Sequence, residues 1–118
     1  MSLTLYGIPN CNSIKKARMW LEGEGIPYHF HDYRKEGLDP ALLDQWLEYF
    51  GWEQLINRKG TTWRQLPETT RNQMDTALAR TLILDKPTLI KRPLLESDNT
   101  RLLGFDAETY AAHMAGDT

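Results

Sequence analysis

The chain has 118 residues and a mass of 13.7 kDa, which corresponds to a single domain. Its composition, 41% hydrophobic and 25% charged, excludes a disordered or collagen-like protein. The net charge of −2 indicates neither a nucleic-acid-binding surface nor a funnel for acidic substrates. No signal-peptide pattern and no apolar run of ~20 residues occurs, and the lone Cys11 favours a reducing compartment. We therefore expect a cytoplasmic protein without nucleic-acid or membrane partners.

The first third predicts a strand, a tight loop, a helix and a second strand. A β-prone run ends at residues 7–10, Gly-Ile-Pro-Asn, which is typical of a turn. After Cys11, three apolar residues share one face of a helix: Ile14, Ala17 and Leu21. Residues 26–33 then alternate aromatic with polar side chains, which favours a strand. This order indicates a βαβ unit with parallel strands.

The middle of the chain predicts helices. Asp39 and Pro40 are typical of a helix start, and apolar residues follow at helical spacing: Leu42, Leu43, Trp46, Leu47 and Phe50. Residues 52–57 favour a short helical turn and residues 58–62 a loop. A further helix is expected to begin at Pro67 or Thr70 and to end before Pro87. Its predicted face consists of Met74, Ala77, Leu78 and Leu82.

The last third predicts strands and a final helix. Strands are expected around Leu89–Ile90 and after Pro93, because proline cannot donate a ladder hydrogen bond and suits a strand start or an edge. Residues 97–99 favour a turn and residues 100–103 its antiparallel partner, before a helix that Asp106 caps and that ends near Gly116. The order βαβ, helical insert, ββα predicts an α/β, thioredoxin-like fold. We expect one domain over residues 1–118, with a small helical subdomain inserted at about 39–86.

Cys11 is the strongest functional candidate. It precedes the expected helix start, where unpaired backbone N–H groups and the helix dipole stabilise a thiolate, and Lys15 adds a positive charge one turn further on. A buried core cysteine is the alternative. The sequence has no second cysteine, so a redox cycle needs a thiol from another molecule, for which glutathione is the usual small candidate.

Four arginines form a second group: Arg58, Arg64, Arg92 and Arg101. A guanidinium binds carboxylates and oxyanions through two parallel hydrogen bonds. Arg92 stands out because it precedes Pro93 at an expected strand start, where the X–Pro bond can be cis. A solvated surface position is the alternative for each of the four.

The remaining candidates are weaker. His29 and His31 share one face of an expected strand, but no Cys, Asp or Glu cluster at metal-ligand spacing accompanies them, so we expect no metal site. The sequence contains no glycine-rich nucleotide-binding loop. The four tryptophans fit a core better than a binding surface, with Trp63, beside Arg64, kept as a candidate binding residue.

Five segments together resemble the arsenate reductase (ArsC)-like family, in its YffB branch, which is related to the Spx regulators. They read LYGIPNC, KKA, HDYR, RKGTTWR and IKRPL, and their order extends over nearly the whole chain. The resemblance implies a thioredoxin-like fold with a helical insert. It also implies that Cys11 is the nucleophile and that Arg92 is followed by a cis Pro93. Arg58 falls near the sequence position of a second oxyanion-binding arginine of the family.

Two positions depart from the family pattern. Arsenate reductases of the family carry a third arginine after the Arg-Pro strand, where this chain has Gly104, and this disfavours arsenate as a substrate. Spx regulators usually carry Cys-x-x-Cys, whose second cysteine is Ile14 here. A thiol switch of that kind is therefore excluded, whereas binding to RNA polymerase is not.

These observations predict a cytoplasmic, monomeric, glutathione-dependent thiol reductase with Cys11 as its nucleophile and no bound cofactor. Glutathione is the expected co-substrate and glutaredoxin a second expected partner. The residues expected to bind glutathione or an oxyanion are Arg92, Arg58, Lys15, Arg64 and Pro93. Arsenate reduction and non-catalytic, Spx-like binding to RNA polymerase remain as alternatives.

Overall fold

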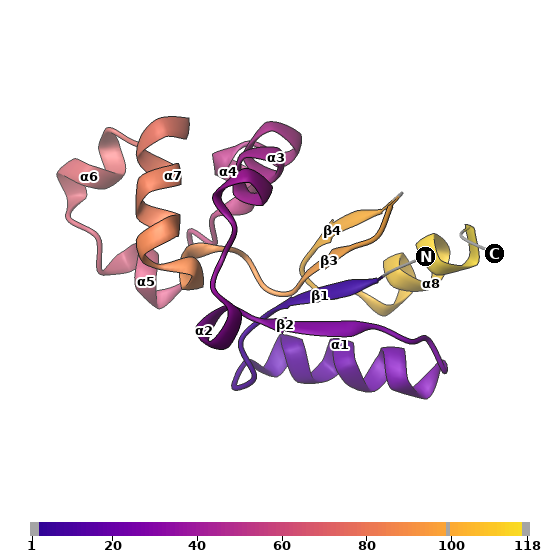
Figure 1. The fold of residues 1–118 in the computed structure, drawn as a ribbon. Coiled ribbons are helices and arrows are strands. Elements are labelled where there is room, and N and C mark those ends of the chain that lie inside the picture. Colours follow the sequence, from indigo (N-terminus) through magenta and orange to yellow (C-terminus); the bar gives the residue numbers. More distant parts are fainter. Residues whose placement is uncertain (1–2, 99, 117–118) are drawn as a thin grey trace. The chain divides into compact units, whose positions relative to one another are not determined.

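The computed structural model describes residues 3–98 and 100–116 and contains two compact units (Figure 1). The first unit comprises Met1–Glu36 and Arg92–Thr118, and the second comprises Gly37–Lys91. The helical insertion expected at about 39–86 falls within the second unit. In the described part of the chain, no helix has the length and apolar character needed to cross a membrane.

The first unit is built on a four-stranded sheet in the order β2-β1-β3-β4. The strands are β1 (Thr4–Gly7), β2 (His29–Asp32), β3 (Leu94–Glu96) and β4 (Arg101–Leu103). β1 pairs in parallel with β2 and antiparallel with β3, and β3 pairs antiparallel with β4. The predicted βαβ start and the predicted terminal hairpin are therefore confirmed. The turn expected at 97–99 includes residue 99, which lies outside the described residues.

One row of apolar side chains crosses the whole sheet. Leu5 in β1 lies opposite both Phe30 in β2 and Leu95 in β3. Leu95 in turn lies opposite Leu102 in β4. Because side chains alternate between the two faces of a strand, all four belong to one face, and they contribute to a single hydrophobic cluster.

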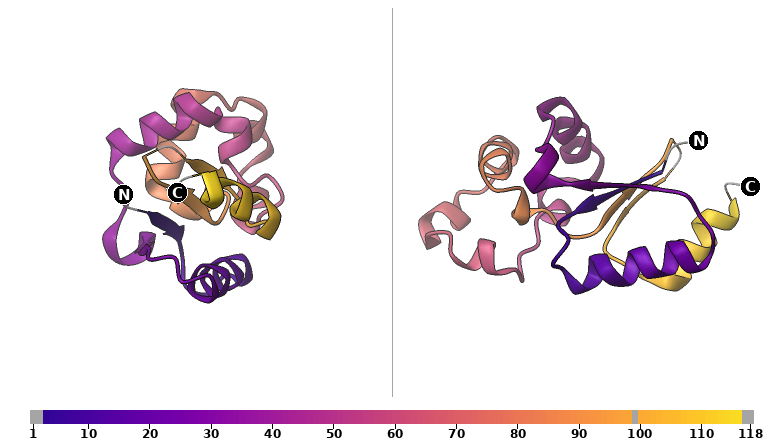
Figure 2. Two further views of the ribbon diagram at one scale, coloured as in Figure 1. Left: turned by 90° about the vertical axis from the view of Figure 1, so that its right-hand side faces the viewer. Right: turned by 60° about the horizontal axis from the view of Figure 1, so that its bottom comes forward.

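Two helices cover that face of the sheet, as Figures 1 and 2 show. α1 (Asn12–Gly23) buries the three apolar residues expected on its inner face, Ile14, Ala17 and Leu21. α8 (Ala107–Gly116) begins after Asp106, whose carboxylate accepts hydrogen bonds from the Thr109 N–H at 3.2 Å and hydroxyl at 2.6 Å. This confirms the predicted cap. A short helix that the sequence did not predict, α2 (Tyr33–Glu36), follows β2 directly.

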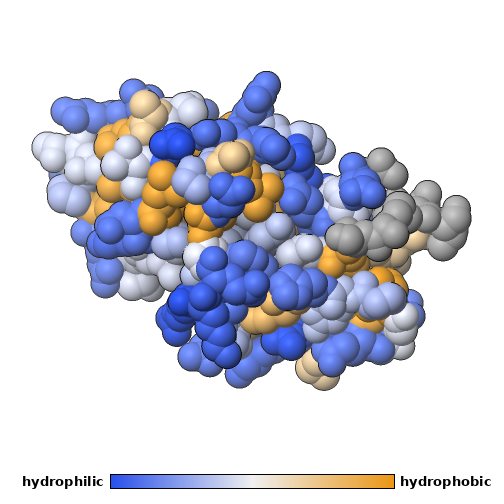
Figure 3. All heavy atoms as spheres, viewed as in Figure 1, coloured by the Kyte–Doolittle hydropathy of each residue, from blue (hydrophilic) through white to orange (hydrophobic). Residues whose placement is uncertain are grey.

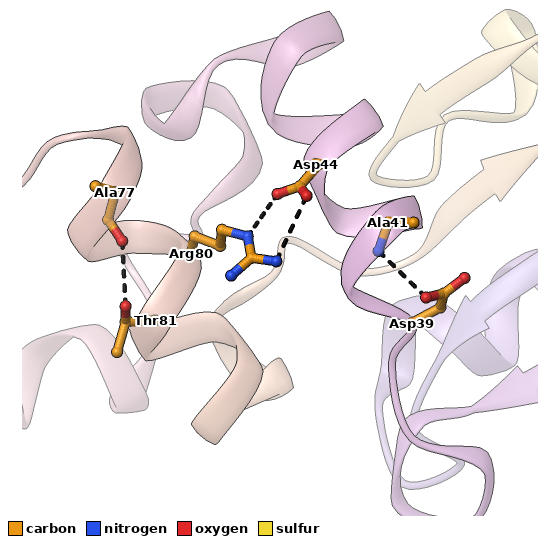
Figure 4. A network of polar contacts seen from close by, with 6 residues as sticks. All are labelled: Asp39, Ala41, Asp44, Ala77, Arg80 and Thr81. Atoms are coloured by element: carbon orange, nitrogen blue, oxygen red, sulfur yellow. Dashed lines mark hydrogen bonds and ion pairs between the residues drawn. The ribbon is translucent and has the colours of Figure 1, made fainter.

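The second unit is helical. Its elements are α3 (Pro40–Phe50), α4 (Trp52–Leu55), α5 (Thr61–Arg64), α6 (Glu68–Asn72), α7 (Thr76–Asp85) and the 3-10 helix η1 (Pro87–Leu89). The Asp39 carboxylate accepts the Ala41 N–H at 3.2 Å and caps α3, as predicted. Arg80 in α7 forms an ion pair of 2.6 Å with Asp44 in α3, so these two helices are joined across their surface (Figure 4).

The helix expected from Pro67 or Thr70 to residue 85 is wrong as a single element, because the chain breaks between α6 and α7. Asp75 has an extended backbone, with φ −146° and ψ −178°, and its carboxylate accepts the Leu78 N–H at 2.8 Å. An aspartate in this role starts a new helix. The fully buried residues of α7 are consequently Ala79 and Ile83, whereas Ala77 is exposed.

Two shorter segments also differ from expectation. Thr61 and Thr62 begin α5 instead of completing a loop. Leu89 ends the 3-10 helix η1, and Ile90 forms only an isolated antiparallel bridge with Ile56. The apolar pair at 89–90 is buried, as a strand would be, which explains why its sequence resembles one.

Gly7, the last residue of β1, has no room for a side chain. A Cβ at this position would clash with Cδ1 of Ile14, the nearest atom, and would lie 2.9 Å from its Cγ1; Ile14 is fully buried. We expect Gly7→Ala to lower the free energy of unfolding by about 1–3 kcal/mol through overpacking. Chemical denaturation measures this loss, and Gly23→Ala is the control, because apart from its chain neighbours and the backbone of its own helix no described atom lies within 4 Å of a Cβ at Gly23.

The cause is tested by shortening Ile14. In the Gly7→Ala/Ile14→Val double variant, the missing Cδ1 relieves the contact, so the two losses should be less than additive. Fully additive losses would show that Ile14 is not the group that excludes a side chain from Gly7.

Candidate active site

Three segments leave the sheet of the first unit at the same edge. The parallel strands β1 and β2 end level with each other, with Gly7 opposite Asp32. β3 runs in the opposite direction and begins at this edge, with Leu94 opposite Tyr6. The loop that leads to Cys11, the residues after Asp32 and the Arg92–Pro93 bond are therefore all placed here by strand register.

Cys11 is the N-cap residue of α1. Its backbone is extended, with φ −99° and ψ 131°, and its carbonyl accepts the Lys15 N–H at 3.0 Å. Its side chain makes no capping hydrogen bond to any described group, so the sulfur has no part in holding the helix start. The residue is half-buried and its thiol is free, which is inconsistent with the alternative of a fully buried core cysteine. The Lys15 residue is exposed.

The Arg92–Pro93 peptide bond is cis, the geometry that the family resemblance implies. Pro93 is buried and its carbonyl accepts the Gly104 N–H at 2.8 Å, so the start of β3 is bonded to the residue that follows β4. Arg92 is half-buried. Strand register thus places Arg92 at the edge of the sheet from which the Cys11 loop departs.

Tyr33 is a candidate site residue that the sequence analysis missed. It is the first residue of α2 and only 4% exposed, and its buried hydroxyl has no hydrogen-bond partner among the described residues. Burial raises the pKa of Tyr33 well above 10, and the Tyr6 hydroxyl adds to the rise, while the positive charge of Arg92 opposes it. The hydroxyl therefore stays protonated and is able to donate a hydrogen bond.

The signal for Tyr33 was its position. It is the last residue of the second predicted strand, within the HDYR segment, and residues at the carboxyl ends of parallel strands meet at one edge. Its ring lies near that of Tyr6 in β1, with centroids 6.2 Å apart. Strand register and aromatic contact together hold Tyr33 at the Cys11 edge of the sheet.

Arg101 lies at the opposite end of the β3–β4 hairpin. Register places it across from Glu96, and its Nε is 2.7 Å from the Glu96 carboxylate. The hairpin end near Pro93 is occupied by Gly104, whose φ of +79° is a conformation that favours glycine. The charge of Arg101 is consequently paired away from the edge where the Cys11 loop leaves the sheet.

Arg58 and Arg64 belong to the second unit, and their predicted role beside Cys11 stays a prediction. The Arg58 guanidinium lies 5.8 Å from the ring centroid of Trp52, which stacks on Trp63 at 6.4 Å. Arg64 donates to the Lys59 carbonyl at 2.6 Å. Trp63 is half-buried, so it is neither a free platform nor a core residue, whereas Trp46 is fully buried as expected.

Comparison with known proteins identifies relatives along the whole chain. The sequence model of the ArsC family matches residues 6–113. The solution structure of an arsenate reductase (ArsC) related protein from Brucella melitensis shares 54% identity and a TM-score of 0.79, covering 97% of this chain and 95% of that one. A solved protein named YFFB shares 43% identity and a TM-score of 0.89, covering 94% of this chain and 97% of that one.

A more distant relative carries a different kind of name. The global transcriptional regulator Spx of Streptococcus agalactiae is 26% identical over 117 residues, which are 98% of this chain and 85% of that protein. The solved relatives confirm the predicted α/β fold of the ArsC, thioredoxin-like type.

Replacing Tyr33 tests whether its hydroxyl is unpaired. A buried polar group without a partner costs about 1–3 kcal/mol, so Tyr33→Phe should leave the free energy of unfolding unchanged or raise it. Tyr110→Phe is the matched control, because the Tyr110 hydroxyl donates to the Gly104 carbonyl at 3.4 Å. Denaturant unfolding should show a loss of about 0.5–1.5 kcal/mol for the control only. An equal loss in both variants would mean that the Tyr33 hydroxyl is already bonded.

Proposed function

The chain belongs to the ArsC family, and from this premise we propose that it is a glutathione-dependent thiol reductase with Cys11 as its single nucleophile. The observation that carries the proposal is the state of Cys11: it is the only cysteine in the sequence, its thiol is free, and it occupies the N-cap position of α1. A helix amino end stabilises a thiolate, which is the nucleophilic form of cysteine. Because no second cysteine resolves an intermediate, the reducing thiol comes from another molecule.

The proposed reaction consists of two thiol–disulfide exchanges. The Cys11 thiolate attacks the glutathione sulfur of a mixed disulfide, forms a Cys11–glutathione disulfide, and releases the substrate as a thiolate. The thiolate of a second glutathione then attacks the glutathione sulfur of this adduct and displaces Cys11 as a thiolate. The substrate disulfide has gained two electrons and is reduced to a thiol, while glutathione leaves as its oxidised disulfide.

Arg92 and Tyr33 suit the recognition of glutathione at this edge of the sheet. A guanidinium binds a carboxylate through charge-assisted hydrogen bonds, and glutathione carries two carboxylates. The protonated Tyr33 hydroxyl offers a further donor that has no partner among the described residues. Lys15, Arg58, Arg64 and Pro93 complete the proposed set. A cytoplasmic location agrees with a single free cysteine, because cytosolic thiols are kept reduced.

The names of the relatives support two other candidates. The Brucella melitensis protein is described as related to an arsenate reductase, which supports arsenate as an alternative substrate. The Streptococcus agalactiae protein is named a global transcriptional regulator, which supports a regulatory role as the second alternative. RNA polymerase as the partner in that alternative rests on the Spx resemblance alone. We favour the thiol reductase because Gly104 stands where the resemblance expects a third arginine, and because Ile14 replaces the second cysteine of the Spx motif.

Incubation with oxidised glutathione should place one glutathionyl group on Cys11, as mass spectrometry of the intact protein and its peptides will show. Addition of reduced glutathione should remove the group. Cys11→Ser should remain unmodified and inactive while keeping its fold, because a serine hydroxyl is not ionised at neutral pH. A Cys11 that stays unmodified would contradict the proposal and favour the partner-binding alternative.

Two arginine variants refine the same experiment. Arg92→Ala should raise the glutathione concentration that gives half-maximal turnover by about tenfold or more, since a hydrogen bond to a charged group contributes about 1.5–3 kcal/mol. Arg101→Ala is the matched control, because Arg101 is already paired with Glu96 at the other end of the hairpin. Equal effects of the two substitutions would remove Arg92 from the proposed binding site.

Arsenate should be a poor substrate or none. Each missing charge-assisted donor at a reacting oxyanion costs about 10²–10³ in rate, and Gly104 offers no side-chain donor. The measurement is arsenate reduction coupled to glutathione and glutaredoxin, compared with the reduction of a glutathione mixed disulfide by the same preparation. Arsenate turnover as fast as disulfide turnover would overturn this expectation and would require another cation, such as Arg64, to act in place of the missing arginine.

A further inference from the structure

Two histidines and a glutamate converge where β2 passes into α2, within the first unit. His29 and His31 are two residues apart in β2, so their side chains leave the strand on the same face. Glu36 is the last residue of α2, and the single turn of this helix brings its side chain near the two histidines. One possible ligand atom from each of the three residues lies within 4.8 Å of the other two. We propose that His29, His31 and Glu36 form a binding site for a divalent transition metal ion such as Zn²⁺.

The distances fit an intervening ion better than direct hydrogen bonds. Oε1 of Glu36 lies 3.5 Å from Nε2 of His29 and 3.8 Å from Nδ1 of His31. Both separations exceed the 2.7–3.2 Å or so of an N–H···O hydrogen bond. Zinc binds nitrogen and oxygen at about 2.0–2.2 Å, so two ligands of a tetrahedral zinc ion lie about 3.3–3.5 Å apart. The His29 side chain is 64% exposed and is free to rotate into the final geometry.

Neighbouring groups already orient two of the three ligands. The Asp32 N–H donates to Oε2 of Glu36 at 3.3 Å, which leaves Oε1 facing the histidines. The His31 ring is in contact with the rings of Tyr6 and Tyr33, at centroid distances of 4.9 and 5.8 Å. A hydrogen bond to a ligating carboxylate, as from Asp32 to Glu36, is typical of the second layer around a metal ion and increases the affinity for it, whereas the two tyrosine rings restrict the His31 ring by packing.

The donor set selects the class of metal. Two imidazoles and one carboxylate suit zinc and its neighbours in the first transition row, whereas Ca²⁺ and Mg²⁺ prefer oxygen ligands alone. Three protein ligands leave a coordination position for water or another small ligand. The surface over α2 is hydrophilic on the face seen in Figure 3, which suits the approach of a hydrated ion.

The site is tested by titrating ZnCl₂ into the wild-type protein and into Cys11→Ser by isothermal titration calorimetry. Cys11→Ser is included because a thiolate binds zinc itself, and because this variant separates the metal site from the proposed thiol reductase activity. One zinc ion should bind to Cys11→Ser. In that background, His29→Ala, His31→Ala and Glu36→Gln should each weaken binding by at least about 10- to 100-fold, since even the loss of a second-layer contact costs that much.

His113→Ala provides the matched control. His113 is the third histidine of the chain, lies in α8 and contacts the Thr109 carbonyl through Nδ1 at 2.9 Å. Its replacement should leave zinc binding unchanged. Visible absorption of bound Co²⁺ provides a second readout for every variant, and circular dichroism of the metal-free protein confirms that each is folded.

Two results would overturn the proposal. One is the absence of zinc binding to Cys11→Ser, which would show that the three residues form only a His–Glu ion pair. The other is binding that His113→Ala weakens as much as the His29 and His31 substitutions do. Neither result would affect the role proposed for Cys11, because the titration does not depend on its thiol.

Discussion

β1 is the strand on which the first unit depends, because it has a partner on each side. Its parallel pairing with β2 makes the two strands end at one edge, and its antiparallel pairing with β3 makes β3 begin there. The register of β1 with its two neighbours therefore places the loop that leads to Cys11, the residues after β2 and the residues before β3 at one edge. Gly7 completes this arrangement, since only a residue without a side chain lets Ile14 of α1 approach the end of the strand.

The polar groups of the first unit differ in whether they already have hydrogen-bond partners. The Cys11 carbonyl is bonded within α1, while its sulfur takes no part in the capping of the helix. The Tyr33 hydroxyl is buried without a partner among the described residues. Buried polar atoms are normally bonded, so the Tyr33 hydroxyl is an exception at the edge of the sheet from which the Cys11 loop leaves. Arg101, by contrast, is held by Glu96 at the other end of the hairpin, where its role is structural.

The sequence pattern was sufficient to predict the four paired strands and the two helices that cover them, although it also predicted a strand at Leu89–Ile90 that does not form. The spacing of Ile14, Ala17 and Leu21 identified the inner face of α1 correctly, because that face follows from local sequence alone. The break at Asp75 was missed, because apolar residues continue at helical spacing through a position where a side-chain cap interrupts the backbone. A prediction based on the spacing of apolar residues ignores helix caps. In the folded chain, however, the Asp75 cap determines where α7 begins.

The candidate site was predicted only where the sequence marks it directly. Cys11 and Arg92–Pro93 carry recognisable neighbours along the chain. The pairing of Arg101 with Glu96 depends on strand register, and the approach of Glu36 to the histidines depends on the turn of α2. Neither contact can be predicted from the spacing of these residues along the sequence. Tyr33 has an ordinary sequence context and gains its character from burial.

The backbone at Gly104 constrains how this chain could evolve. Its φ of +79° is accessible to glycine, whereas an L-residue in the left-handed region costs roughly 1–2 kcal/mol. A single Gly104→Arg substitution would therefore add the missing charge and, at the same time, strain the bond to Pro93 that joins β4 to the start of β3. An arginine introduced at position 104 would therefore bring its charge together with a conformational cost, because the backbone of this chain at that position is one that glycine adopts most readily.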